Sequence, residues 1–339
     1  MPPWRNSRGV TKNSMKEINI LVTSVGRRVE LITCFQNAKK NLNIIGNIVA
    51  ADASETAPAC FFADKKYKIC RIDNDDYINQ IINICNRESI DLIIPTIDTE
   101  LIKLSYHKSI IENRSKARVL ISSQKVIDIC RDKYKTVDFF IENEINTPKY
   151  ITKEDIKHEK YKFPMFIKPL NGSSSINAFK INNHMELVFF TNYIEDYILQ
   201  EFIEGEEYTI DAFCDFQGNP ITIVPRKRIA VRSGEILKGI TVKNTLIINK
   251  VKQVLNILKP VGQITLQGIL NSQGFFFIEI NPRFGGGAPM SIAAGADSCE
   301  NLYKILGGEN LFYNEDFEDG LLSMRFDQAI FIDKEGQLK

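Results

Sequence analysis

One stretch near the carboxyl end, residues 264–287, constrains the fold more than any other part of the chain. Residues 264–270 and 275–281 are two apolar runs of strand length, separated by a short polar segment that ends in Gly274. This pattern predicts a β-hairpin with a three-residue loop, 272–274, in which the glycine takes the left-handed conformation. Pro282 ends the second strand, because proline has no amide hydrogen to donate.

The second strand of this hairpin carries polar side chains in an otherwise apolar run. A period of two predicts one face made of Phe275, Phe277, Glu279 and Asn281 and an opposite face made of Phe276, Ile278 and Ile280. The predicted register sets Gln267 opposite Glu279. Carboxylate and amide oxygens suit Mg²⁺ when phosphate and water complete its shell, so we predict a metal site at Gln267, Glu279 and Asn281.

Arg283 follows directly after this strand and can reach a phosphoryl group that the metal holds. The alternative is an exposed hairpin face that merely carries polar residues. For any one of these side chains the alternative is the better interpretation. For Gln267, Glu279, Asn281 and Arg283 together, ahead of the glycine turn 285–287, the sequence favours a site.

The composition excludes several classes of function. Lys and Arg number 43 against 42 Asp and Glu, so no global charge indicates a nucleic-acid or membrane partner. No apolar run is long enough to span a bilayer. The seven cysteines are scattered without a CxxC pair, which fits reduced thiols in the cytoplasm, and three histidines are too few for a histidine metal site.

The first part of the chain alternates between strand and helix patterns. We expect strands at 18–23, 44–51, 92–95 and 119–121 with helices between them, and hence a doubly wound parallel sheet over residues 15–123. Residues 1–14 are polar and are interpreted as a disordered tail or a remnant of cloning. The sheet's ligand edge holds one glycine, Gly26, where a dinucleotide fingerprint needs three, so the sequence argues against NAD.

Charged residues also gather at this edge. Arg27 and Arg28 open a helix and either bind a substrate anion or are simply solvated. Asp98 and Glu100 either recognise a substrate amine or cap a helix, and for Asp98 capping is the favoured interpretation.

Further motifs follow along the chain. Lys133 lies in the segment DKYKT, and Lys168 ends a strand before the small-residue loop 171–175. A strand at 197–202 then leads through an acidic turn into the strand 208–214, and basic residues cluster from 225 to 238. With the hairpin, these motifs resemble the ATP-grasp superfamily, and most closely its carbamoyl-phosphate-synthetase-like members. The resemblance spans about residues 18–332.

The resemblance implies a role for each motif. ATP would be held by Lys133, Lys168, Ser173, Ser174, Ser175, Glu201, Phe202, Ile203, Glu207 and Lys238. The catalytic side chains would be Arg283, Lys168, Arg228 and Arg232. Two Mg²⁺ ions, or Mn²⁺ in their place, would bind at the hairpin, although Gln267 departs from the acidic ligand of many members.

The implied fold combines α/β and α+β parts. The parallel-sheet domain, residues 15–123, would precede a helical connector at 124–164 and a two-lobed ATP-grasp domain. Its small lobe would cover 165–205 and its large lobe 206–333, with a short tail at 334–339.

The implied activity is an ATP-dependent ligase that converts a small-molecule carboxylate into an acyl phosphate and joins it to an amine. The alternatives are a bicarbonate-activating enzyme and a non-catalytic ATP-binding regulatory module. The chain has a single ATP-grasp unit and no room for a glutaminase, which argues against carbamoyl phosphate synthesis itself. A homodimer is compatible with the resemblance.

Overall fold

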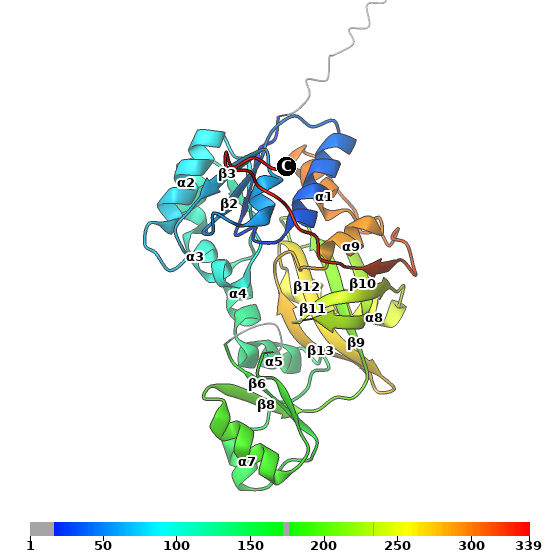
Figure 1. Cartoon of the computed structure of the whole chain (residues 1–339). Coiled ribbons are helices and arrows are strands. Elements are labelled where there is room, and N and C mark those ends of the chain that lie inside the picture. The colour runs from blue at the N-terminus through cyan, green and yellow to red at the C-terminus, as the bar shows by residue number, and fades with distance from the viewer. Residues whose placement is uncertain (1–16, 172–175, 233) are drawn as a thin grey trace, which may run out of the picture.

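The computed structural model describes residues 17–171, 176–232 and 234–339. The predicted tail 1–14 and the predicted nucleotide-binding residues Ser173, Ser174 and Ser175 lie outside this part of the chain. The described chain forms three β-sheets, and Figure 1 shows them with helices packed around them.

The first sheet has five parallel strands in the order β3-β2-β1-β4-β5, as the strand–helix alternation predicted. Its strands are β1 (Ile20–Thr23), β2 (Ile48–Asp52), β3 (Lys65–Lys68), β4 (Leu92–Pro95) and β5 (Arg118–Val119), with the 3-10 helix η1 (Pro58–Phe61) after β2. Helices α1 (Val29–Asn41), α2 (Tyr77–Glu88) and α3 (Asp98–Ser115) cover it, and separate hydrophobic clusters fill its two faces. The sequence did not predict β3, an edge strand with three exposed lysines.

The second sheet is small, antiparallel and ordered β7-β6-β8. It consists of β6 (Met165–Pro169), β7 (Phe179–Ile181) and β8 (Tyr197–Glu201), with α7 (His184–Tyr193) packed on it. Figure 1 shows this small lobe at the bottom of the molecule. It follows the helices α4 (Gln124–Arg131), α5 (Lys133–Glu142) and α6 (Lys153–Lys157).

The third sheet is antiparallel, with six strands in the order β13-β12-β9-β10-β11-β14. They are β9 (Glu206–Cys214), β10 (Pro220–Arg232), β11 (Glu235–Thr241), β12 (Gly262–Asn271), β13 (Gly274–Asn281) and β14 (Leu322–Met324). Helix α8 (Thr245–Leu258) packs its apolar stripe on one face. The strand predicted over 322–332 is wrong beyond Met324, since Arg325 makes the last backbone bond to β11 and the following chain leaves the sheet edge.

Two short helices connect the third sheet back to the first. Helices α9 (Ala288–Ala293) and α10 (Ser298–Leu306) pack against α1, where the ring of Phe35 meets those of Phe284 and Tyr303 edge-on. Because this shared core spans both sheets, the loop 285–287 is held between them. The predicted domain boundaries stay a prediction.

The hairpin β12–β13 pairs Gln267 with Glu279, as predicted. Its loop is shorter than predicted, because Gly274, at φ 131°, already pairs with Asn271 and leaves only residues 272 and 273 in the turn.

The predicted division of β13 into two faces is also wrong. A β-bulge lies between Gln267 and Gly268, so the strand changes phase after Phe277. Phe275, Phe277 and Ile280 are therefore all buried under α8, while Glu279 and Asn281 lie on the opposite face. A Cβ atom on Gly268 would lie 2.3 Å from the ring of Phe275, so the bulge requires glycine here.

Candidate active site

A cavity of about 400 Å³ lies between the first domain and the third sheet. Its floor consists of side chains from β9 to β13, and the loop 285–287 forms another wall. The remaining wall comes from the start of α3, from Arg28 and from Arg131. Residues from both domains therefore meet in one cavity.

The floor of the cavity is ordered by the register of the antiparallel strands. Glu279, Gln267, Thr209 and Arg226 are paired in one row across four strands. A second row contains Asn281, Thr265 and Asp211. Because directly paired residues point to the same face of a sheet, the polar side chains of both rows share one face.

The predicted metal ligands Gln267, Glu279 and Asn281 all line this cavity. Among the described residues, no group of three His, Cys, Asp or Glu side chains could hold a metal ion. A cation here would thus have one carboxylate and two amide oxygens from the protein. That donor set fits a hard ion such as Mg²⁺ whose remaining ligands are phosphate and water.

Lys133 and Lys168 meet Glu279 in a small adjoining pocket between α5, β6 and β13. The Lys133 ammonium donates to the Leu170 carbonyl oxygen at 2.6 Å. Burial lowers the pKa of Lys168 to about 8 and also lowers the pKa of Lys133, while Glu279 opposes both shifts. Two partly desolvated cations beside one carboxylate favour an incoming anion.

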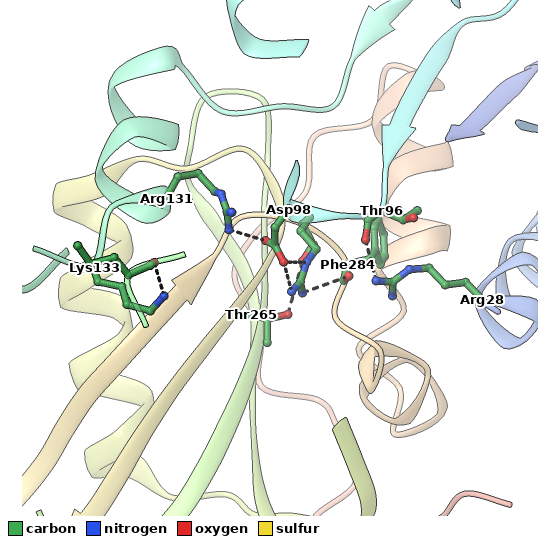
Figure 2. A network of polar contacts seen from close by, with 9 residues as sticks. Arg28, Thr96, Asp98, Arg131, Lys133, Thr265 and Phe284 are labelled. Atoms are coloured by element: carbon green, nitrogen blue, oxygen red, sulfur yellow. Dashed lines mark hydrogen bonds and ion pairs between the residues drawn. The ribbon is translucent and has the colours of Figure 1, made fainter. Parts of the chain in front are cut away.

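Arg283 is held by Asp98 of the first domain, whose carboxylate Figure 2 shows facing Arg131. Its Nη2 and Nε donate to Asp98 Oδ2 at 2.7 and 3.2 Å, and Arg131 Nη1 lies 3.7 Å from Asp98 Oδ1. The capping interpretation of Asp98 is wrong, because Ile97 is the N-cap of α3 and the carboxylate is engaged by the two arginines.

Two pairs of charged residues lie at the edge of the first sheet, Arg27 with Arg28 and Asp98 with Glu100. One member of each pair lines the cavity, and the other does not. Arg28 lines the cavity and donates through Nη2 to the Thr96 carbonyl oxygen at 2.7 Å, whereas Arg27 is exposed. Burial and the nearby Arg283 lower the pKa of Arg28 to about 10. Glu100 is fully buried and accepts from the hydroxyl groups of Ser24 and Tyr77, so it faces no substrate.

The predicted basic residues of β10 and β11 are not all brought together. Arg228 lines the cavity, where Nη1 lies 3.2 Å from Glu207 Oε2 and 3.5 Å from Gln267 Oε1. Arg232 instead forms a bidentate ion pair with Asp327 outside the cavity, with hydrogen bonds of 2.8 and 2.6 Å. Lys238 is exposed on β11 and does not line the cavity either.

Four of the predicted ATP-binding residues lie at the end of β8, at the start of β9 and in the segment that joins these strands. Glu201 accepts from the Lys149 amide at 3.3 Å, and the Lys180 ammonium lies 4.2 Å from the ring centre of Phe202. Ile203 follows them, and Glu207 is exposed at the start of β9. Their contact with a nucleotide stays a prediction.

Sequence reasoning missed several residues of the cavity, above all Arg226, Arg131 and Glu235, and it also missed Asp211, the buried partner of Arg226. Arg226 precedes Arg228 by two positions, and this spacing on a strand already places both on one face. The other residues come from distant segments that only the fold brings together.

A parallel-sheet domain followed by two antiparallel lobes, with amide, carboxylate and arginine groups at a hairpin end, defines an ATP-grasp arrangement. Comparison with known families agrees: residues 130–287 match the ATP-grasp domain, and residues 20–117 match the PylC-like N-terminal domain. The chain therefore combines a PylC-like N-terminal domain with an ATP-grasp domain.

Individual relatives are distant. The carbamoyl phosphate synthase large chain of Caldanaerobacter subterraneus subsp. tengcongensis is 24% identical over 221 residues, which cover 58% of this chain but only 20% of that protein. The D-alanine–D-alanine ligase B of Clostridium perfringens is 35% identical over 98 residues, covering 25% of this chain and 32% of that one.

A solved structure has the same fold. It is the biotin carboxylase domain dimer of the Hydrogenobacter thermophilus 2-oxoglutarate carboxylase, in complex with MgADP, ADP and bicarbonate. It superposes with a TM-score of 0.70 at 21% identity, covering 89% of this chain and 73% of that chain.

Proposed function

We propose that this chain is an ATP-dependent ligase that activates a small-molecule carboxylate and joins it to an amine, releasing ADP and phosphate. The observation that carries this proposal is the convergence of Gln267, Glu279, Asn281, Arg228 and Arg283 on one cavity. The D-alanine–D-alanine ligase relative supports the reaction class, because its name describes the joining of two amino acids.

The charges of the cavity suit phosphoryl transfer, which requires positioning and electrostatic stabilisation rather than a protein nucleophile. Lys133 and Lys168 are placed to bind phosphate oxygens beside Glu279. Arg283, fixed by Asp98, is placed to stabilise the phosphoryl group and the activated acid. Mg²⁺ on Glu279, Asn281 and Gln267 would supply Lewis-acid chemistry when bound, and we propose two ions.

The test is release of ADP and phosphate from Mg²⁺-ATP with pooled carboxylic acids, each pool with and without amino acids, and with hydroxylamine as a trap. The expected result is release that depends on one acid, together with a trapped hydroxamate. Tight ATP binding without turnover in any pool would contradict the proposal and favour a regulatory module. Release with bicarbonate alone would favour the bicarbonate-activating alternative.

The remaining proposals concern the state of the protein in the cell. We expect a homodimer, and light scattering after gel filtration measures it. All seven cysteines are free, which supports a reducing compartment such as the cytoplasm. No helix among the described residues has the length and apolar character needed to cross a membrane.

A further inference from the structure

Arg226 on β10 is a buried cation with unused hydrogen-bond donors. Its side chain is 1% exposed and lies 2.8 Å, through Nη2, from Oδ2 of the equally buried Asp211. Within the described residues, Nε and Nη1 have no hydrogen-bond partner. Leaving buried donors unpaired costs free energy, so a guanidinium of this kind indicates a ligand that completes its hydrogen bonds.

The surroundings hold Arg226 in place at the cavity. Arg226 lines the same cavity as the predicted metal ligands. Its partner Asp211 is fixed by the hydroxyl of Ser291 on α9, which donates to Oδ2 at 2.6 Å. A Cβ atom on Gly287 would lie 2.5 Å from Arg226 Nη1, so only a glycine allows the loop 285–287 to pass this close.

The backbone positions of Arg226 and Glu279 lie far apart. It belongs to the same row as Glu279 but is separated from it by β12 and β9, which is three strand spacings. At about 4.8 Å per spacing, the two backbone positions are about 14 Å apart. Asp211 holds the guanidinium over β9, which is still two strand spacings from β13, so we assign a group bound at Arg226 to a position other than that of the carboxylate that reacts beside Glu279.

We propose that Arg226 forms a second anion subsite, which binds a carboxylate of the substrate that does not react. This inference rests on the proposed ligase function for its two substrates. Charge-assisted hydrogen bonds from Nε and Nη1 suit carboxylate oxygens, and Arg28 adds positive charge to the same cavity. The carboxylate belongs either to the acid, which is then a dicarboxylate, or to the amine, which is then an amino acid.

The binding test needs no turnover. In full-length protein labelled with ¹⁵N-arginine, the Arg226 Nε–H signal is assigned by its loss in Arg226→Lys. Succinate or L-alanine is expected to shift this signal saturably, equally in the control Lys227→Met at a half-exposed position next to Arg226, and chloride is expected to leave the signal unchanged. No saturable shift with either acid would overturn the inference, and a shift with inorganic phosphate alone would overturn the carboxylate assignment.

Kinetics then assign the carboxylate to one substrate. Arg226→Lys is expected to raise the KM of either the acid or the amine at least tenfold while the KM of ATP stays unchanged. The double variant Arg226→Gln/Asp211→Asn, which leaves no unpaired buried charge, should behave in the same way and guards against misfolding. If the wild-type protein turns over and the variants keep the KM values of both the acid and the amine, the subsite alone is overturned. If the Arg226 signal shifts saturably but no turnover is found, the ligase proposal alone is overturned.

Discussion

Asp98 and Arg283 are joined by two hydrogen bonds, of 2.7 and 3.2 Å, although they lie 185 positions apart in the sequence. Asp98 begins α3 in the parallel-sheet domain, and Arg283 follows β13 in the large lobe. One carboxylate of the first domain thus orients the arginine that we assign to the transferring phosphoryl group. The same carboxylate also lies near Arg131, which completes a link between three segments (Figure 2).

Asp98→Asn is expected to lower kcat by tenfold to a hundredfold with little change in the KM of ATP. The variant removes charge-assisted bonds worth about 1.5–3 kcal/mol, which correspond to one or two factors of ten in rate. Steady-state ADP release measures the effect, with the exposed Asp73→Asn as control. If Arg283→Lys and the double variant Asp98→Asn/Arg283→Lys each lose as much kcat as Asp98→Asn alone, the two residues act as one unit. Additive losses would contradict the positioning role.

Glu279→Gln is expected to abolish acid-dependent ATP turnover by at least a hundredfold and to raise the Mg²⁺ concentration needed for half-maximal rate. Glu279 is the only carboxylate among the three predicted metal ligands, so its replacement removes the sole protein charge on the ion. Glu142→Gln, on the exposed side of α5, is the matched control. Unchanged turnover and Mg²⁺ dependence would show that the metal assignment is wrong.

The hairpin shows how far the sequence could predict this site. Apolar runs and turn residues predicted the pairing of Gln267 with Glu279, and this pairing holds because two departures from the predicted hairpin cancel: the loop is one residue shorter, and the bulge adds one residue to β13. They could not reveal the bulge at Gly268, which reverses the face of Glu279 and Asn281 relative to Phe275 and Phe277. A bulge depends on packing between strands, which period-two reasoning does not include.

Contacts between residues from distant segments are a second feature that the sequence could not predict. The alternation of strands and helices was enough to predict the parallel sheet, since each element buries its own apolar face. The position of Asp98 against Arg283 depends on how two domains dock, and this docking has no signature in either segment. Arg232 shows the opposite case. It lies on the same strand as Arg226 and Arg228, which line the cavity, but its own side chain pairs with Asp327 outside the cavity.

Gly268→Ala is expected to destabilise the protein by about 1–3 kcal/mol, the usual range for an overpacked core position. The added Cβ would lie 2.3 Å from the ring of Phe275 and 2.6 Å from the carbonyl oxygen of Phe276. Urea unfolding followed by circular dichroism measures the change, with Ser272→Ala in the exposed turn of the same hairpin as control. Equal midpoints for the two variants would contradict the bulge geometry.

ATP affinity is expected to fall as the pH rises from 7 to 9.5, because burial lowers the pKa of Lys168 to about 8. Below this value the ammonium is charged and attracts phosphate oxygens, and above it the neutral amine does not. The effect of Lys168 on stability has the opposite direction. Between about pH 8 and the ordinary pKa of lysine, this side chain holds more protons in the unfolded chain than in the folded one, so it makes the free energy of unfolding increase with pH. Titration of ATP at fixed Mg²⁺ measures the affinity at each pH. Lys168→Arg, which stays charged throughout, should flatten the profile, and a wild-type profile that is already flat would contradict a role for Lys168 in phosphate binding.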